Sequence, residues 1–332
     1  MNGSRGKSSS PRNDQRVACM AQHLVSIQQA SFKEAWLTIG TFDGVHIGHQ
    51  EIVRGLAAGA KAEGAPAIVV TFHPHPAAVV RQQGGPHLLS MPDERAEYLQ
   101  EAGADVVITQ PFDQQIAGTN AEDFLGLLKK HLGFRHLWVG YDFALGHKRS
   151  GDIHRLSELA EQLDYQLQVV PAVHLHGQIV SSSRIRGLLR EGQVANAAQA
   201  LGRWYKLTGD VVKGDGRGHT LGFPTANLAV PVEKFVPESG VYACIAQVEG
   251  MAWRAAVNIG LRPTFDGSSA TTQIEAHILD YQGDLYGQQM SLSFIERLRD
   301  EKGFPSIQAL IEQIQQDIQK TRELVSVTPP VR

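Results

Sequence analysis

The chain has 332 residues, which is too long for one ordinary core and suits two domains of about 150 residues each. Hydrophobic residues make up 42% and charged residues 20%, a composition that excludes disorder over most of the length. A formal net charge of −3 gives no general field for nucleic acid, and no run approaches the roughly 20 apolar residues of a membrane span. We therefore expect neither nucleic acid nor membrane as a partner, and any phosphate-bearing ligand must be held by local groups.

The beginning of the chain has the composition of a leader. Residues 1–19 are rich in Ser, Arg and Lys, with Asp14 as their only acid. Disordered tails and organelle transit peptides share this composition, and a start at Met20 is a third explanation. We expect residues 1–30 to be a disordered leader. The composition does not decide among a tail, a transit peptide and a start at Met20. The two cysteines, Cys19 and Cys244, support neither a disulfide framework nor a cysteine zinc site, which fits a reducing, cytoplasmic setting.

The next segment alternates short apolar runs with longer amphipathic stretches. Each apolar run is typical of a strand that is buried on both faces. The stretches between the runs have the pattern of helices, several of which end in glycine. This pattern predicts an α/β domain with a parallel sheet over residues 31–188. The predicted strands are 36–42, 67–72, 105–109, 136–140 and 166–171.

After a helical linker region at 189–203, the pattern changes to short strands joined by turn-rich loops. Six such strands within 204–325 predict a small antiparallel β-barrel, with a hairpin at Glu249 and Gly250. A final helix follows Ser306, a suitable N-cap, and we expect its apolar stripe to pack on the barrel. The stripe consists of Ile307, Leu310, Ile311, Ile314 and Ile318. We find no internal repeat.

The segment TIGTFDGVHIGHQ lies where the first predicted strand of the sheet ends and a helix begins. Ligands of such sheets bind at the carboxyl ends of strands, where a helix N-terminus offers free N–H groups to phosphate. Glycines here permit close backbone approach, and His46 and His49 can stabilise charge on an α-phosphate as pyrophosphate leaves. The alternative is half of a zinc site completed by His73 and His75. The candidate phosphate-binding residues are Gly40, Phe42, Asp43, Gly44 and Gly48.

Two further segments are candidates. VSSSRIRGLL follows the last predicted strand of the sheet, and it is either a phosphate-binding helix start or a capped surface helix with solvated arginines. TGDVVKGDGRGHTLGFPTANL contains five glycines, which either expose N–H groups to phosphate or mark turns and bulges of the barrel.

Four motifs in the first half, GTFDGVHIGHQ, VTFHPHP, VGYDFALGHKRSGD and VSSSRIRGLL, resemble the nucleotidyltransferase half of bacterial bifunctional riboflavin kinase/FAD synthetases. The resemblance implies a Rossmann-like FMN adenylyltransferase domain in which His46 and His49 contact the ATP phosphates. It also implies a second phosphate-binding patch and a flavin side. The patch would be Ser182, Ser183, Arg184 and Arg186, and the flavin side Asp142, Phe143 and Arg149.

The second half resembles the riboflavin kinases, through GFPTAN, VNIGLRPTF, IEAHILDYQGDLYGQ and LRDEKGF. Thr225 and Asn227 are two apart on a strand, so both point to one face and can hold Mg²⁺ and the ATP phosphates. By the resemblance Glu275 is the general base, although a charged residue on an outer strand face is its ordinary explanation. Arg299 is assigned to the flavin, with a surface ion pair as the alternative. The glycine loop would contribute Gly214 and Gly222 to phosphate binding.

Two positions depart from the family pattern. Leu145 stands where an aromatic residue is more common, which affects the expected packing against flavin. His219 stands where arginine is usual, so phosphate binding by that loop would be weaker or more dependent on pH.

We therefore expect an enzyme that phosphorylates riboflavin and adenylylates the resulting FMN to FAD, with ATP as co-substrate and Mg²⁺ as cofactor in both reactions. One alternative is a riboflavin kinase with an inactive nucleotide-binding N-terminal half, and another is a non-catalytic flavin-binding regulator. The retained HxGH and SSSRIR segments argue against the first, and Thr225 and Glu275 against the second. The expected partners are small molecules, riboflavin, FMN and ATP, and the sequence leaves the oligomeric state open.

Overall fold

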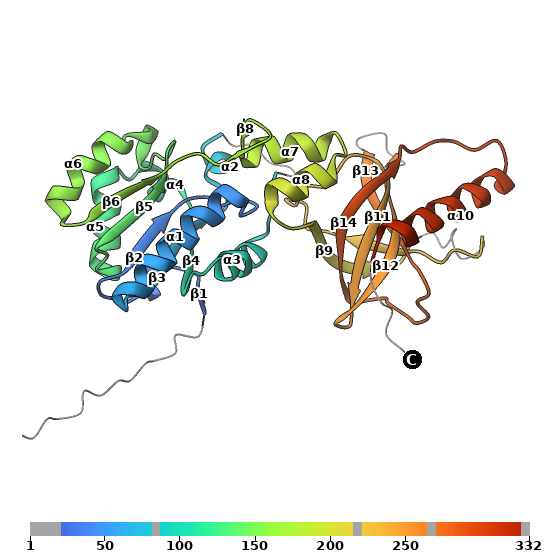
Figure 1. Ribbon diagram of the computed structural model, residues 1–332, viewed down its shortest axis with the longest axis horizontal. Helices are drawn as coiled ribbons and strands as arrows, with labels where there is room; N and C mark the ends of the chain where they lie inside the picture. The colour runs from blue at the N-terminus through green and yellow to red at the C-terminus, as the bar shows by residue number, and fades with distance from the viewer. Residues whose placement is uncertain (1–20, 82–86, 215–220, 264–269, 327–332) are drawn as a thin grey trace, which may run out of the picture.

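The computed structural model describes residues 21–81, 87–214, 221–263 and 270–326. It has an α/β part and a β-barrel part, and helices α7 (Ser182–Arg190) and α8 (Val194–Leu201) lie between them (Figure 1). The predicted fold class is confirmed. In the described residues, no helix has the length and apolar character needed to cross a bilayer.

A six-stranded parallel sheet forms the core of the first part, in the order β1-β4-β3-β2-β5-β6. All five predicted strands are present, and one unpredicted strand is added at the edge. The bounds are β1 (Gln22–Leu24), β2 (Trp36–Ile39), β3 (Ala67–His73), β4 (Val106–Pro111), β5 (His136–Gly140) and β6 (Gln166–Val170).

Helices cover both faces of this sheet. Apolar residues of α1 (Ile47–Glu63) and α3 (Pro92–Glu101) pack with Val69 and Val107, and those of α5 (Ala121–Leu132) and α6 (Ile153–Leu163) pack with Leu37 and Ile68. Alternate strand residues point to opposite faces, which is why the runs read as continuously apolar. Two short helices, α2 (Pro76–Arg81) and α4 (Gln114–Gly118), complete this part.

The predicted leader 1–30 is too long. Residues 22–24 form β1, which pairs in parallel with Val106–Ile108 of β4, and Ile27 is fully buried in the core under α5. The sequence QHL has no apolar run, so the strand depends on the partner that β4 provides.

The second part is a closed antiparallel barrel in the order β10-β13-β12-β11-β14-β9. Its six strands are those predicted, and the hairpin is where expected: Val248 pairs with Met251, and Glu249 and Gly250 have φ of 51° and 76°. The bounds are β9 (Tyr205–Val212), β10 (Ala226–Ala229), β11 (Gly240–Val248), β12 (Met251–Pro263), β13 (Ala270–Ile278) and β14 (Gln289–Arg299).

The final helix, α10 (Ile307–Leu324), lies along the barrel and begins at its predicted cap, with Ser306 accepting the backbone N–H of Ala309 (Figure 1). Four residues of the expected stripe, Leu310, Ile311, Ile314 and Ile318, are half-buried, but the packed face is not the stripe alone. Ile307 is 67% exposed, whereas Asp317 and Thr321 are buried. Helix periodicity identified the helix, but not the polar residues that pack inward.

Helices α7 and α8 are not a detached linker. Their residues Ile185, Leu189 and Ala197 are fully buried in the same cluster as the barrel core. Across the junction, Leu88 forms a parallel bridge with Lys234. The region 189–203 therefore packs on the barrel, while the first turn of α7 reaches back toward the sheet.

Candidate active sites

The two histidines of the HxGH segment lie where the loop after β2 meets α1: His46 precedes the helix and His49 is in its first turn. His46 caps α1, because its Nδ1 accepts the backbone N–H of His49 at 3.3 Å. A neutral His46 must then carry its proton on Nε2, where it can be donated to a ligand. The two rings stack with centroids 3.6 Å apart. The pair thus places imidazole groups at a helix N-terminus, which favours anions.

Burial sets the charge of these histidines. Desolvation lowers the pKa of His46 to about 4, and the nearby Asp43 opposes this shift. The pKa of His49 lies well below its ordinary value, chiefly because the ring is buried and next because His46 is its neighbour. Both rings are neutral at pH 7, so they offer N–H donors and not positive charge.

A cleft of about 960 Å³ opens at the carboxyl ends of the parallel strands. This is the position at which α/β sheets bind ligands, and the volume suits a nucleotide together with a second substrate. The lining includes most of the residues predicted for this half. These are Gly40, Phe42, His46, Gly48, His49, Asp142, Phe143, Arg149, Ser182, Ser183 and Arg186.

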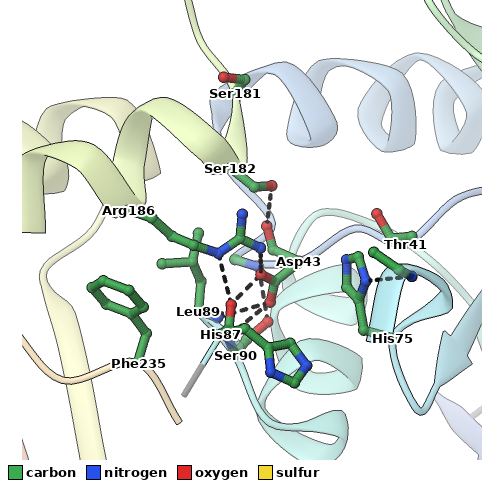
Figure 2. A network of polar contacts seen from close by, with 12 residues as sticks. Thr41, Asp43, His75, His87, Leu89, Ser90, Ser181, Ser182, Arg186 and Phe235 are labelled. Carbon is green, nitrogen blue, oxygen red and sulfur yellow. Dashed lines mark hydrogen bonds and ion pairs between the residues drawn. The ribbon is translucent and has the colours of Figure 1, made fainter. Parts of the chain in front are cut away.

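The first turn of α7 joins this cleft to the loop before α1. Ser182 Oγ donates to the carbonyl oxygen of Asp43 at 2.8 Å, and Arg186 Nη2 lies 2.5 Å from the Asp43 carboxylate. Arg186 Nε also donates to the carbonyl oxygen of His87 (Figure 2). The expected second patch is therefore assembled against the first motif, with Ser181 as the cap of α7.

Three predicted residues lie outside the cleft lining that the described residues form: Asp43, Gly44 and Arg184. Asp43 is fully buried and accepts the backbone N–H groups of Leu89 and Ser90 at 2.9 and 3.1 Å. Arg184 Nη1 donates to the carbonyls of the hairpin formed by β7 (His174–Leu175) and β8 (Gln178–Ile179). These side chains hold loops in place.

The zinc alternative is wrong for the residues that the structure describes, since none of their His, Cys, Asp and Glu side chains form a group of three or more suited to a metal. His75 instead lines the cleft with its Nδ1 accepting the N–H of Ala77, and burial lowers its pKa to about 4. A place for His75 in the cleft was not predicted, although the VTFHPHP motif, which contains it, could have indicated one.

The far wall of the cleft carries the residues expected to contact flavin. Arg149 Nη2 donates to the carbonyl oxygen of Asp142 at 3.0 Å, and Phe143 packs on the core under the wall. Leu145 lines the cleft and pairs with Gly151 in a short bridge. The departure at Leu145 thus puts an aliphatic side chain on the cleft wall.

On the barrel, Asn227 of β10 lies directly opposite Glu275 of β13. Their neighbours Ala226 and Ala276 belong to the barrel core, so Asn227 and Glu275 project from the outer face. Gln273 joins them, because its Nε2 lies 2.8 Å from both Asn227 Oδ1 and Glu275 Oε1. Gln273 was not predicted; its signal was the two-residue spacing from Glu275, which places both on one face.

The glycine loop meets this cluster at Gly214, where a Cβ would lie 2.0 Å from Asn227 Nδ2. The backbone can approach Asn227 only because the side chain is absent. Gly222 has a φ of 84°, and the half-buried Thr225 immediately precedes β10. His219 lies outside the described residues.

Arg299, at the end of β14, is held by α10. Its Nε and Nη2 lie 3.0 and 2.9 Å from Asp317 Oδ2, and Asp317 is 3% exposed. Much of the guanidinium therefore holds the final helix against the barrel. This buried pair joins residues 18 positions apart and is not the local surface ion pair of the alternative.

Comparisons with known proteins agree with this division. The FAD synthetase family model matches residues 28–184, and the Riboflavin kinase model matches residues 201–325. The chain is 35% identical over 310 residues to the bifunctional riboflavin kinase/FMN adenylyltransferase of Escherichia coli strain K12, covering 92% of this chain and 97% of the relative. For the protein of that description from Bacillus subtilis strain 168, the identity is 32% over 302 residues, covering 90% and 94%.

Among solved structures, the chain resembles a crystal structure described as a macrolide-efflux protein from Streptococcus pneumoniae. The TM-score is 0.83 at 28% identity, over 92% of this chain and 100% of that one. The shared architecture therefore extends over both parts of the molecule.

Proposed function

This chain belongs to the family of bifunctional riboflavin kinase/FMN adenylyltransferases, and from that premise we propose how its residues divide the two reactions. The enzyme phosphorylates riboflavin to FMN with ATP and adenylylates FMN to FAD with release of pyrophosphate. The division rests on one observation: the stacked His46–His49 pair and the Asn227–Glu275 pair belong to different domains. We assign adenylyl transfer to 31–188 and the kinase to 204–325.

In adenylyl transfer, a phosphate oxygen of FMN attacks the α-phosphorus of ATP, and the bond to pyrophosphate breaks. FMN phosphate is already ionised, so no general base is required. Negative charge builds on the leaving group, and preorganised donors beside it lower the barrier. His46, by its Nε2–H, and His49 supply such donors, and the hydroxyls of Ser182 and Ser183 with Arg186 complete the cradle.

In the kinase reaction, the 5′-hydroxyl oxygen of riboflavin attacks the γ-phosphorus, the bond to ADP breaks, and Glu275 takes the hydroxyl proton. Glu275 is half-buried on the outer face of the barrel, beside Asn227 and Gln273. This position supports the role because the base is fixed by a neighbour and remains reachable from outside the barrel.

The side-chain oxygen atoms beside Glu275 are suitable ligands for magnesium, a hard cation that keeps several waters and takes few protein ligands. Asn227 Oδ1 accepts from Gln273 and retains a second lone pair, and Thr225 lies two residues earlier. We assign Mg²⁺ of the kinase site to Thr225 and Asn227. When bound, the ion neutralises phosphate charge.

The reactants are small molecules, riboflavin, FMN and ATP, and we place both reactions in the cytoplasm. The glycines at 214 and 222 are assigned to phosphate binding in the kinase site, and Asp142, Phe143 and Arg149 to the flavin in the cleft.

Two variants test the division in a single assay. The protein is incubated with ATP, Mg²⁺ and either riboflavin or FMN, and the flavins are separated by chromatography. Glu275→Gln is expected to abolish FMN formation and to leave FAD formation from added FMN intact. His46→Asn keeps a cap acceptor for α1 and is expected to do the reverse. If either variant lost both activities while folded, the two-site assignment would be wrong.

A further inference from the structure

Arg95, in the first turn of α3, is fully buried beneath the cleft. Its Nη1 donates to the backbone carbonyl oxygens of Thr41 and Phe72, each at 2.9 Å. Thr41 follows the end of β2, and Phe72 is the penultimate residue of β3. One guanidinium nitrogen therefore ties together the two loops that line the cleft on this side.

Both loops carry groups of the adenylyl-transfer site. Thr41 precedes a turn in which Phe42 and Val45 have φ of 47° and 38°, a region that such side chains rarely adopt. The Phe42 ring stands edge-on to His49 with centroids 5.1 Å apart. A strained turn that sets a histidine ring needs an external support, and Arg95 provides it at the carbonyl just before the turn.

The other loop follows His73, the last residue of β3, and leads to His75, which lines the same cleft. Thr71 Oγ1 donates to the Thr41 carbonyl at 2.9 Å and lies 3.0 Å from Arg95 Nη1. The two strand ends are thus joined directly and through Arg95.

Stability alone does not account for this residue. Its Nε and Nη2 are buried without a hydrogen-bond partner among the described residues, and desolvation lowers its pKa. A buried charge with most of its N–H donors unpaired costs folding free energy, and an apolar side chain of similar volume is often no worse. A cation that is buried at this cost indicates a functional demand.

The neighbouring Glu94 fixes the helix that presents Arg95. Its carboxylate forms a buried ion pair with Lys234 and lies 3.2 Å from Thr208 Oγ1, both on the barrel side of the molecule. The first turn of α3 is therefore anchored on one side to the barrel and on the other to the loops of the cleft.

We propose that Arg95 is a positioning residue for adenylyl transfer, which sets the spacing of the segments that lead to His46, His49 and His75 through the carbonyl oxygens of Thr41 and Phe72. It touches no substrate. The inference rests on the proposed assignment of adenylyl transfer to this cleft.

The test compares Arg95→Met and Arg95→Lys in the full-length protein, measuring kcat and KM for ATP in FMN adenylylation. The Met variant is expected to lose about tenfold or more in kcat/KM, mainly through a higher KM, while Lys, which can still donate to the carbonyls, recovers most of it. Riboflavin kinase activity is the internal control and should stay within about twofold. Arg54→Met removes an exposed arginine of α1 and is the matched control. It should have wild-type kinetics in both reactions.

A Met variant with normal kinase activity and normal kcat/KM for ATP in adenylylation would overturn the inference. If the Met variant lost both activities through unfolding, Arg95→Gln would decide, since its shorter side chain cannot reach both carbonyl oxygens and should give a selective loss of adenylylation. Full retention of adenylylation in Arg95→Gln would again overturn the inference. His46→Asn separates the two claims. If that variant makes FAD normally, the assignment of the cleft is wrong, whatever Arg95 does.

Discussion

Asp43 and Arg186 form an ion pair at 2.5 Å between residues 143 positions apart in the chain. The Asp43 carboxylate is fully buried and already accepts two backbone N–H groups, whereas Arg186 reaches the cleft lining (Figure 2). A buried carboxylate would repel phosphate. We infer that Asp43 orients Arg186 and that Arg186 meets the ligand.

Asp43→Asn tests this relationship. The amide can still accept from Leu89 and Ser90, but it places a neutral donor group where Arg186 needs an acceptor. We expect kcat/KM for ATP in FMN adenylylation to fall about tenfold to a hundredfold, and kinase activity to remain unchanged. Steady-state kinetics of both reactions measure this. Asp164→Asn, which removes an exposed carboxylate paired with Arg135, serves as the control and should behave as the wild type. Equal adenylylation in the two variants would contradict the inference.

Gln273→Met should impair only the kinase. Methionine has a similar length but no donor, so Asn227 and Glu275 lose the amide that holds them together. Because the base itself remains, we expect kcat for riboflavin phosphorylation to fall about tenfold rather than to vanish. FAD formation from added FMN reports on folding. Gln319→Met, on the exposed side of α10, is the matched control, and a kinase as active as that control would dismiss Gln273 as a positioning residue.

Gly214→Ala should also act on the kinase, by a steric route. The new Cβ would lie 2.0 Å from Asn227 Nδ2, so either the loop or the amide must move. We expect a loss of about tenfold in kinase kcat/KM, with adenylylation unchanged. Gly126→Ala in α5 is the control, since a Cβ there has no neighbour within 4 Å. Undiminished kinase activity would show that the close approach of residue 214 to Asn227 is not needed for the reaction.

The sequence was sufficient for features that depend on local pattern. The barrel strand β13 alternates Ile274 and Ala276 inward with Gln273 and Glu275 outward, a period-two pattern that is visible without coordinates. Likewise, the position of His46 between a buried strand and a helix predicted its place at the mouth of the sheet.

Features that depend on a distant partner were missed. β1 forms because it pairs with β4, which lies about 80 residues later in the chain. Asp317 is buried on the packed face of α10 because Arg299 reaches it from β14, and no helical pattern predicts an inward aspartate. The role of Arg95 also depends on distant partners. Its acceptors are backbone carbonyl oxygens of other elements, and every residue has a carbonyl, so the sequence does not indicate which ones it contacts.

The neutral histidines of the cleft predict how stability depends on pH. The pKa of His46 is about 4 in the folded protein, against 6.5 for the unperturbed side chain. Between these values the unfolded chain binds the additional proton, so the free energy of unfolding falls as the pH is lowered through this range, and above pH 6.5 the effect vanishes. One pKa unit corresponds to about 1.4 kcal/mol, which gives an order of 3 kcal/mol for His46 at acid pH.

His46→Asn removes this titration while keeping an N-cap for α1, so the variant should be more resistant to acid than the wild type. We expect similar urea midpoints at pH 7 and a loss between pH 7 and pH 4.5 that is smaller in the variant by about 2 kcal/mol. Urea unfolding followed by tryptophan fluorescence at both pH values measures the difference. His154→Asn, at an exposed histidine of α6, should leave the wild-type pH dependence unchanged. If the two variants lost equal stability on acidification, His46 would be charged or solvated in the folded protein, and its role as a neutral Nε2–H donor would have to be abandoned.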